Sequence, residues 1–177
     1  MLKKVLTLTP SAIKTAKDKL AAYIKQAKSL DIMKDHNAPN WEDATWNVSS
    51  FTKRPSEAST NALLQFRPVG ERRGGNQNEP YPDEFGDVLK AYMAHYLDET
   101  YGTGKQKANA TVAIYLIAIR KLIDALISEH SLKCITDVQL WQIEDYLKTL
   151  KGHSNYSMAK LFLKGLINAG ILPQLEM

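Results

Sequence analysis

The chain has 177 residues, of which 44% are hydrophobic and 24% charged, with a formal net charge of +4. This composition is typical of a globular protein and excludes wholesale disorder. A single cysteine, Cys134, excludes a disulfide framework and any multi-cysteine metal site within the chain. No apolar run reaches the ~18 residues of a membrane span, and the first residues are too polar for a signal peptide. We therefore expect a cytoplasmic protein that does not enter a membrane.

The charge changes sign twice along the sequence. Residues 1–80 have a net charge of +5, residues 81–104 of −4 and residues 105–177 of +3. This pattern indicates faces with different partners, and an anionic partner for the positive parts.

A first helix is expected over residues 9–29, because Thr9 can cap it and Pro10 suits its first position. Apolar residues at helical spacing predict a buried stripe formed by Ile13, Ala16, Leu20, Ile24 and Ala27. A separate lysine face is either simply solvated or a secondary set of DNA phosphate contacts. It consists of Lys14, Lys17, Lys25 and Lys28.

The rest of the first 80 residues has a weaker pattern. Residues 31–43 have loop composition, whereas residues 44–69 contain two strand-like segments that predict a β-hairpin. Residues 70–81 are rich in glycine and polar residues and predict a flexible linker that exposes Arg72 and Arg73. We place a domain boundary near residue 80, between a small α/β N-terminal region (1–80) and a helical domain (82–177).

The helical domain is expected to contain four helices with short connections. The first two cover about residues 83–101 and 108–129, and the second is apolar on most of its circumference, as in a helix at the centre of a bundle. The third is expected to begin with Thr136 as its cap and Gln139 three residues later, a capping-box pattern. The fourth is expected to run from Ser154 or Asn155 to Gly170.

The sequence contains no recognisable catalytic constellation. Its four histidines are scattered, and the pair Gly74-Gly75 lacks the helix and lysine that follow a phosphate-binding loop. One cysteine and isolated imidazoles do not supply the usual ligand set of a zinc site. We therefore expect no catalytic residue, metal, cofactor or small-molecule substrate in this chain.

Basic and small polar residues gather where the second and fourth helices begin. Around the second they are Lys105, Lys107, Asn109 and Thr111; around the fourth they are Lys151, Ser154, Asn155, Ser157, Lys160 and Lys164. A helix N-terminus attracts phosphate, and these side chains commonly contact the DNA backbone. The same residue types also occur as ordinary helix caps, so the pattern alone leaves both interpretations open.

Residues 82–173 resemble the core-binding domain of tyrosine recombinases, the phage-integrase family of site-specific DNA recombinases. Four segments in the order of the family's four helices carry the likeness: DEFGDVLKAYMAHYL, ATVAIYLIAIRKLIDAL, TDVQLWQIEDYLKTL and SNYSMAKLFLKGLINAGILP. The second segment includes Thr111 and Tyr115, and the fourth ends with the exit formed by Gly170, Ile171 and Pro173.

The resemblance implies a mainly α fold, a four-helix SAM-like bundle, preceded here by the α/β region. Such a domain forms half of a clamp around the core-site duplex during DNA integration and recombination, and its second and fourth helices cross the major groove. Double-stranded DNA and other recombinase protomers are the implied partners, with a nucleoid location when DNA is bound. Tyr115 is expected to pack rather than to contact DNA.

The resemblance does not extend to the catalytic domain of the family. The family's catalytic domain follows the core-binding domain and is absent from these 177 residues, so the chain is expected to bind DNA without cutting or joining it. It would be either an expressed fragment or a truncated gene product. Residues 1–80 are expected to pack on the bundle as an extension, with an arm-type DNA-binding module as the second choice.

Two other functions stay open. The first is a helical protein-interaction module that does not bind DNA and uses an apolar surface or an acidic face. That face would comprise Asp83, Glu84, Asp87, Asp98 and Glu99. The second is a stand-alone RNA-binding domain, which the lack of repeated aromatic residues for base stacking disfavours.

Overall fold

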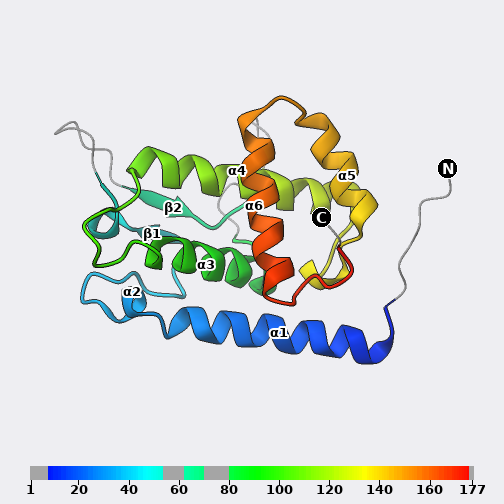
Figure 1. Cartoon of the computed structure of the whole chain (residues 1–177), viewed down its shortest axis with the longest axis horizontal. Helices are drawn as coiled ribbons and strands as arrows, with labels where there is room; N and C mark the ends of the chain where they lie inside the picture. Colours follow the sequence, from blue (N-terminus) through cyan, green and yellow to red (C-terminus); the bar gives the residue numbers. More distant parts are fainter. Residues whose placement is uncertain (1–7, 54–61, 70–79, 176–177) are drawn as a thin grey trace.

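A computed structural model describes residues 8–53, 62–69 and 80–175, and shows a mainly α fold with a small two-stranded sheet (Figure 1). This confirms the mainly α class. The elements are α1 (Pro10–Lys28), α2 (Asp31–Lys34), β1 (Thr45–Asn47), β2 (Leu63–Gln65), α3 (Asp83–Asp98), α4 (Asn109–His130), α5 (Leu140–Thr149) and α6 (Ser154–Asn168). Short 3-10 turns occupy Ser49–Phe51 and Ile135–Asp137.

Helix α4 lies at the centre of the helical part, as its apolar circumference predicts. It contacts α3, α5, α6 and strand β2, and Leu116, Ile119 and Leu122 are fully enclosed. Tyr115 is also buried, in agreement with the expectation that it packs. One stripe nevertheless faces solvent, where Ile114 and Ile117 are 49% and 40% exposed.

Helix α1 packs along α3 and lies beside it in Figure 1. The predicted cap is present, because the Thr9 hydroxyl accepts a hydrogen bond of 3.2 Å from the backbone N–H of Ala12. Ala16, Leu20 and Ala27 are buried as expected. The other two members of the predicted stripe are less enclosed: Ile24 is half-buried against the core and Ile13 is 36% exposed.

The predicted hairpin is formed by β1 and β2, which pair antiparallel with Trp46 opposite Leu64. Both side chains are buried, and the Trp46 ring packs edge-on against Phe66. Alternation of buried and exposed residues along β2 turns Leu64 to the core and leaves Leu63 outside. The connection at residues 54–61 lies outside the described residues.

One hydrophobic core extends from the N-terminal region into the helical bundle. Polar contacts join the two at α4: Asp124 Oδ2 accepts a hydrogen bond of 2.7 Å from the Val69 N–H, and the Tyr81 hydroxyl donates to Oδ1. The nearby Arg120 donates to the Pro68 carbonyl oxygen over 3.1 Å. The domain boundary near residue 80 stays a prediction, and most of the proposed linker, residues 70–79 with Arg72 and Arg73, lies outside the described residues.

Residues 31–43 are not entirely loop. Residues 31–34 form α2 because Ile32 is buried and its N–H lies 3.4 Å from Asp98 Oδ1 on α3. The loop composition of the segment holds only beyond this turn.

The third helix of the bundle begins at Leu140, so the predicted start at Thr136 is wrong. Ile135 and Val138 are both fully buried, and the backbone between them turns as a short 3-10 segment before Val138 becomes extended. Instead, the Gln139 N–H donates a hydrogen bond of 2.9 Å to Oε1 of Gln142, which lies three residues later in the chain. Buried anchors therefore decide where the helix begins.

Candidate nucleic-acid interface

The predicted contacts around the start of α4 divide into two pairs. Lys105 and Thr111 are exposed. Lys107 instead turns inward: its Nζ lies 2.7 Å from Glu99 Oε2 and 3.6 Å from the centre of the Tyr96 ring. Asn109 is 8% exposed, and its N–H donates to the Lys53 carbonyl oxygen over 3.1 Å. Lys105 and Thr111 are therefore the accessible candidates here.

The predicted contacts at the start of α6 are more accessible. The exposed members of this set are Lys151, Ser154, Ser157 and Lys164. The Asn155 N–H faces the His153 imidazole, whose Nδ1 caps the helix at 3.4 Å. Lys160 is half-buried, with its Nζ 5.3 Å from the centre of the Tyr156 ring. The exposed residues could reach a phosphate without any change in packing.

The lysine face of α1 is also open to solvent. Lys14, Lys17 and Lys25 are exposed, and Lys28 Nζ lies 5.2 Å above the Trp41 ring. Lys19 is a further exposed lysine that the sequence pattern did not single out. Its aliphatic chain lies against Gly170, since a Cβ at that glycine would be 3.4 Å from Lys19 Cγ. Tertiary packing thus brings α1 to the C-terminal end of α6.

The two helix starts do not lie side by side. In Figure 1, α4 begins at the left edge of the molecule, whereas α6 begins at the top and crosses in front of α4. The basic residues therefore form separate exposed groups on α1, α4 and α6 rather than one cluster.

The acidic segment of α3 has partners inside the molecule. Asp87 Oδ1 accepts a hydrogen bond of 2.9 Å from the Trp41 indole, and Glu84 Oε1 accepts one of 3.1 Å from the Ile135 N–H. Asp98 receives the Ile32 N–H and Glu99 pairs with Lys107. The side chain of Asp83 lies outside the described residues. The negative charge between residues 81 and 104 is thus largely used to hold the fold together.

Among the described residues, no group of three or more His, Cys, Asp or Glu side chains could hold a metal ion. Cys134 is half-buried, and burial together with the nearby Glu84 raises the pKa of its thiol. A raised pKa disfavours the reactive thiolate. The described helices include none that is long and apolar enough to cross a membrane.

No protein-family model matches this sequence, and no curated protein or solved structure gives a significant match. The resemblance of residues 82–173 to recombinase core-binding domains therefore stays a prediction from four sequence segments. Any function has to rest on the charges and contacts of the described residues.

Proposed function

We propose that this chain is the DNA-binding N-terminal part of a site-specific tyrosine recombinase. In this proposal α3 to α6 act as a SAM-like core-binding bundle that grips the core-site duplex as half of a clamp. The arrangement of four helices with α4 at the centre is compatible with that role. Cutting and joining of DNA would belong to a separate catalytic domain.

The observation that carries the proposal is a set of exposed lysines that form no ion pair with any described residue. They lie on α1, just before α6 and on the second half of α6; they are Lys14, Lys17, Lys25, Lys151 and Lys164. Because the acids of α3 are engaged internally, these charges are free to neutralise an external polyanion. A protein that neutralises phosphates gains affinity by releasing counterions.

The small polar residues suit backbone contacts in the same region. Ser154 and Ser157 project from the first turn of α6, beside Lys151. Hydroxyl groups and a helix N-terminus both donate hydrogen bonds to phosphate oxygens, and such contacts set the position of a protein on DNA. Lys105 and Thr111 offer a second, separate set of contacts. We therefore expect strong backbone binding with limited base readout.

Two observations favour DNA over the alternatives. A protein partner on the acidic face of α3 would have to compete with the hydrogen bonds that Asp87 and Glu84 already make. Stacking of RNA bases needs accessible aromatic rings, whereas Tyr92, Tyr96 and Tyr115 stack on one another between α3 and α4.

The direct test is fluorescence anisotropy of a labelled ~30-base-pair duplex titrated with the chain at ~50 and ~200 mM salt. If ~5 phosphates are neutralised, the logarithm of the affinity should fall with the logarithm of salt at a slope of about −4 to −5. A structured RNA of equal length serves as the competitor. Absence of binding at the lower salt concentration would reject the proposal, and preference for the RNA would replace DNA as the partner.

A further inference from the structure

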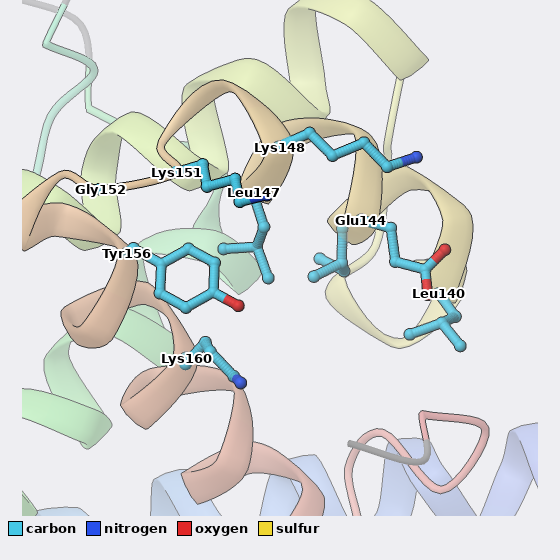
Figure 2. Close-up of a pocket in the computed structure, with 9 residues that line it drawn as sticks. Leu140, Glu144, Leu147, Lys148, Lys151, Gly152, Tyr156 and Lys160 are labelled. Carbon is cyan, nitrogen blue, oxygen red and sulfur yellow. The ribbon is translucent and has the colours of Figure 1, made fainter.

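An open groove of about 750 Å³ lies between α5 and α6 (Figure 2). Its accessible apolar surface comes from Leu140 on α5 and Tyr156 on α6, which are both half-buried, while Ile143 and Leu147 lie buried beneath them. Figure 2 shows the Tyr156 ring and Leu147 facing one another across the opening. The lining does not include the exposed serines assigned above to DNA, but it does include Lys151.

The groove exists because each of the two helices packs on α4 rather than on its neighbour. Contacts of α5 and of α6 with α4 dominate their packing, and the two helices diverge from the turn that joins them. Gly152 permits that turn, since its φ of 83° lies in the left-handed region that side chains disfavour. On the open side of the pair, Leu140 and the Tyr156 ring stay partly exposed to solvent.

Lysines surround this apolar floor. Lys148, Lys151 and Lys160 line the groove together with one acid, Glu144, which gives the lining a net charge of +2. Lys148 is only loosely paired, with its Nζ 3.5 Å from Asp145 Oδ1 and most of its side chain exposed. The ammonium of Lys160 lies near the Tyr156 ring, at the side of the groove formed by α6. A complementary ligand would combine apolar side chains with negative charges.

We propose that the groove between α5 and α6 binds an acidic amphipathic helix of a partner protein. A helix laid between two diverging helices buries its apolar stripe in the floor and places carboxylates beside the lysines. Helix α5 has 10 residues and is about 15 Å long, so a partner helix of about three turns matches it. Lys151 lines the groove and is also a proposed DNA contact, so the two proposals share that lysine, and variants at Lys148 and Lys160 distinguish them.

The composition of the groove favours a peptide over a nucleic acid. A sugar–phosphate backbone could satisfy the lysines, but it has no apolar side chains with which to cover Leu140 and the Tyr156 ring. Burial of these two side chains by an amphipathic helix removes apolar surface from water and adds to the gain from the charges. The charges then set the orientation and select acidic partners.

The test uses the full chain and a library of random 16-residue peptides displayed on phage. We expect selection to enrich peptides that carry apolar residues at i, i+3 or i+4, and i+7, flanked by Asp or Glu. A fluorescein-labelled synthetic copy of the most enriched peptide is then titrated with the variants. The double variant Lys148→Glu/Lys160→Glu should weaken its binding about tenfold, as expected for charge reversal at one exposed and one half-buried lysine. Leu140→Ser, at a position that is only half-buried, should also weaken it.

The matched control is Lys121→Glu/Lys133→Glu, which reverses two exposed lysines outside the groove and should leave peptide affinity unchanged. Enrichment of peptides without acids, or equal binding to both double variants, would overturn the proposal. So would displacement of the peptide by the ~30-base-pair duplex together with loss of DNA affinity in Lys148→Glu/Lys160→Glu, because the groove would then belong to DNA. A chain that binds the peptide but no DNA would reject only the recombinase proposal.

Discussion

The indole N–H of Trp41 donates a hydrogen bond of 2.9 Å to Oδ1 of Asp87. Trp41 follows α2 in the N-terminal region and Asp87 lies in the first half of α3, so the bond crosses between the two predicted parts of the chain. The carbonyl oxygen of Trp41 also accepts a hydrogen bond of 2.5 Å from Lys90 Nζ. A buried indole without an acceptor is costly, which makes this contact specific as well as favourable.

Substitution Asp87→Ala should therefore lower the free energy of unfolding by about 1–3 kcal/mol, the cost of leaving a buried donor without a partner. Urea denaturation monitored by circular dichroism measures the change. The control is Asp18→Ala, at an exposed position on α1, which should stay within ~0.5 kcal/mol of the wild type. Equal stabilities of the two variants would mean that the Trp41 contact contributes nothing.

Two isoleucines on α4 provide a matched test of its central position. Ile119 is fully buried, so Ile119→Ala should cost about 2–5 kcal/mol of stability through lost burial and a cavity. Ile117, two residues earlier, is 40% exposed, and Ile117→Ala should cost clearly less. Thermal melting of both variants measures the two losses of stability. Similar losses would mean that the core contacts another face of the helix.

Two glycines inside helices should respond in opposite directions to alanine. At Gly165 on α6 the new Cβ would lie 2.9 Å from Tyr92 Cε2, so Gly165→Ala should displace that ring and destabilise the fold by about 1–3 kcal/mol. At Gly86 on α3 the nearest atoms, both of Tyr81, are 3.9 Å away, and Gly86→Ala should stabilise by up to ~1 kcal/mol. Equilibrium urea titrations give both values. A stable Gly165→Ala protein would show that Tyr92 moves freely.

The stability of the fold should decrease as the pH falls below about 6.5. Burial lowers the pKa of His95, although Asp98 and Glu99 oppose the shift, and its Nε2 has no hydrogen-bond partner among the described residues. The unfolded chain then binds the proton more readily than the folded chain, so stability is fully present above the unfolded pKa and is lost below it.

Urea midpoints between pH 7.5 and 5.5 measure this loss. In the wild type, the ring centroids of His95 and Tyr23 are 4.8 Å apart and the rings are stacked. The variant His95→Phe keeps a ring at this position and should flatten the dependence of stability on pH in this range. Asp35, whose pKa is lowered mainly by the Asn37 backbone N–H, titrates at lower pH and does not interfere. An unchanged slope in His95→Phe would assign the effect to other groups.

The salt dependence of DNA binding should reveal which lysines contact phosphate. Lys164→Ala and Lys151→Ala should each reduce the magnitude of the salt slope by about one, because each removes one neutralised phosphate. Both side chains are exposed, so the melting temperature should not change. Lys133→Ala, at an exposed position after α4, is the control and should keep the full slope. A normal slope in both the Lys151 and the Lys164 variant would remove this region from the interface.

Local sequence patterns were sufficient for the elements whose stability depends on neighbouring residues. Thr9 and Pro10 set the beginning of α1, and the apolar circumference of α4 indicated its central place. Both signals act within one or two helical turns, so they can be recognised without knowledge of distant contacts. The hairpin was also predicted from composition, although its two strands pair residues as far apart as Thr45 and Gln65.

Tertiary structure decided what the polar residues do. Lys107 and Asn109 belong to the same group of basic and small polar residues as Lys105 and Thr111. Packing against Glu99 and the Lys53 backbone nevertheless turns Lys107 and Asn109 inward. The acids of α3 meet donors that lie 46 to 66 residues away in sequence, and burial of Val138 moves the start of α5 to Leu140. The sequence by itself determined the long helices α1 and α4 and the positive charge of the chain. Long-range packing alone decided which face of each helix is exposed and formed the groove between α5 and α6. The reason is that the free energy of a buried polar or apolar group depends on the neighbours that the fold supplies.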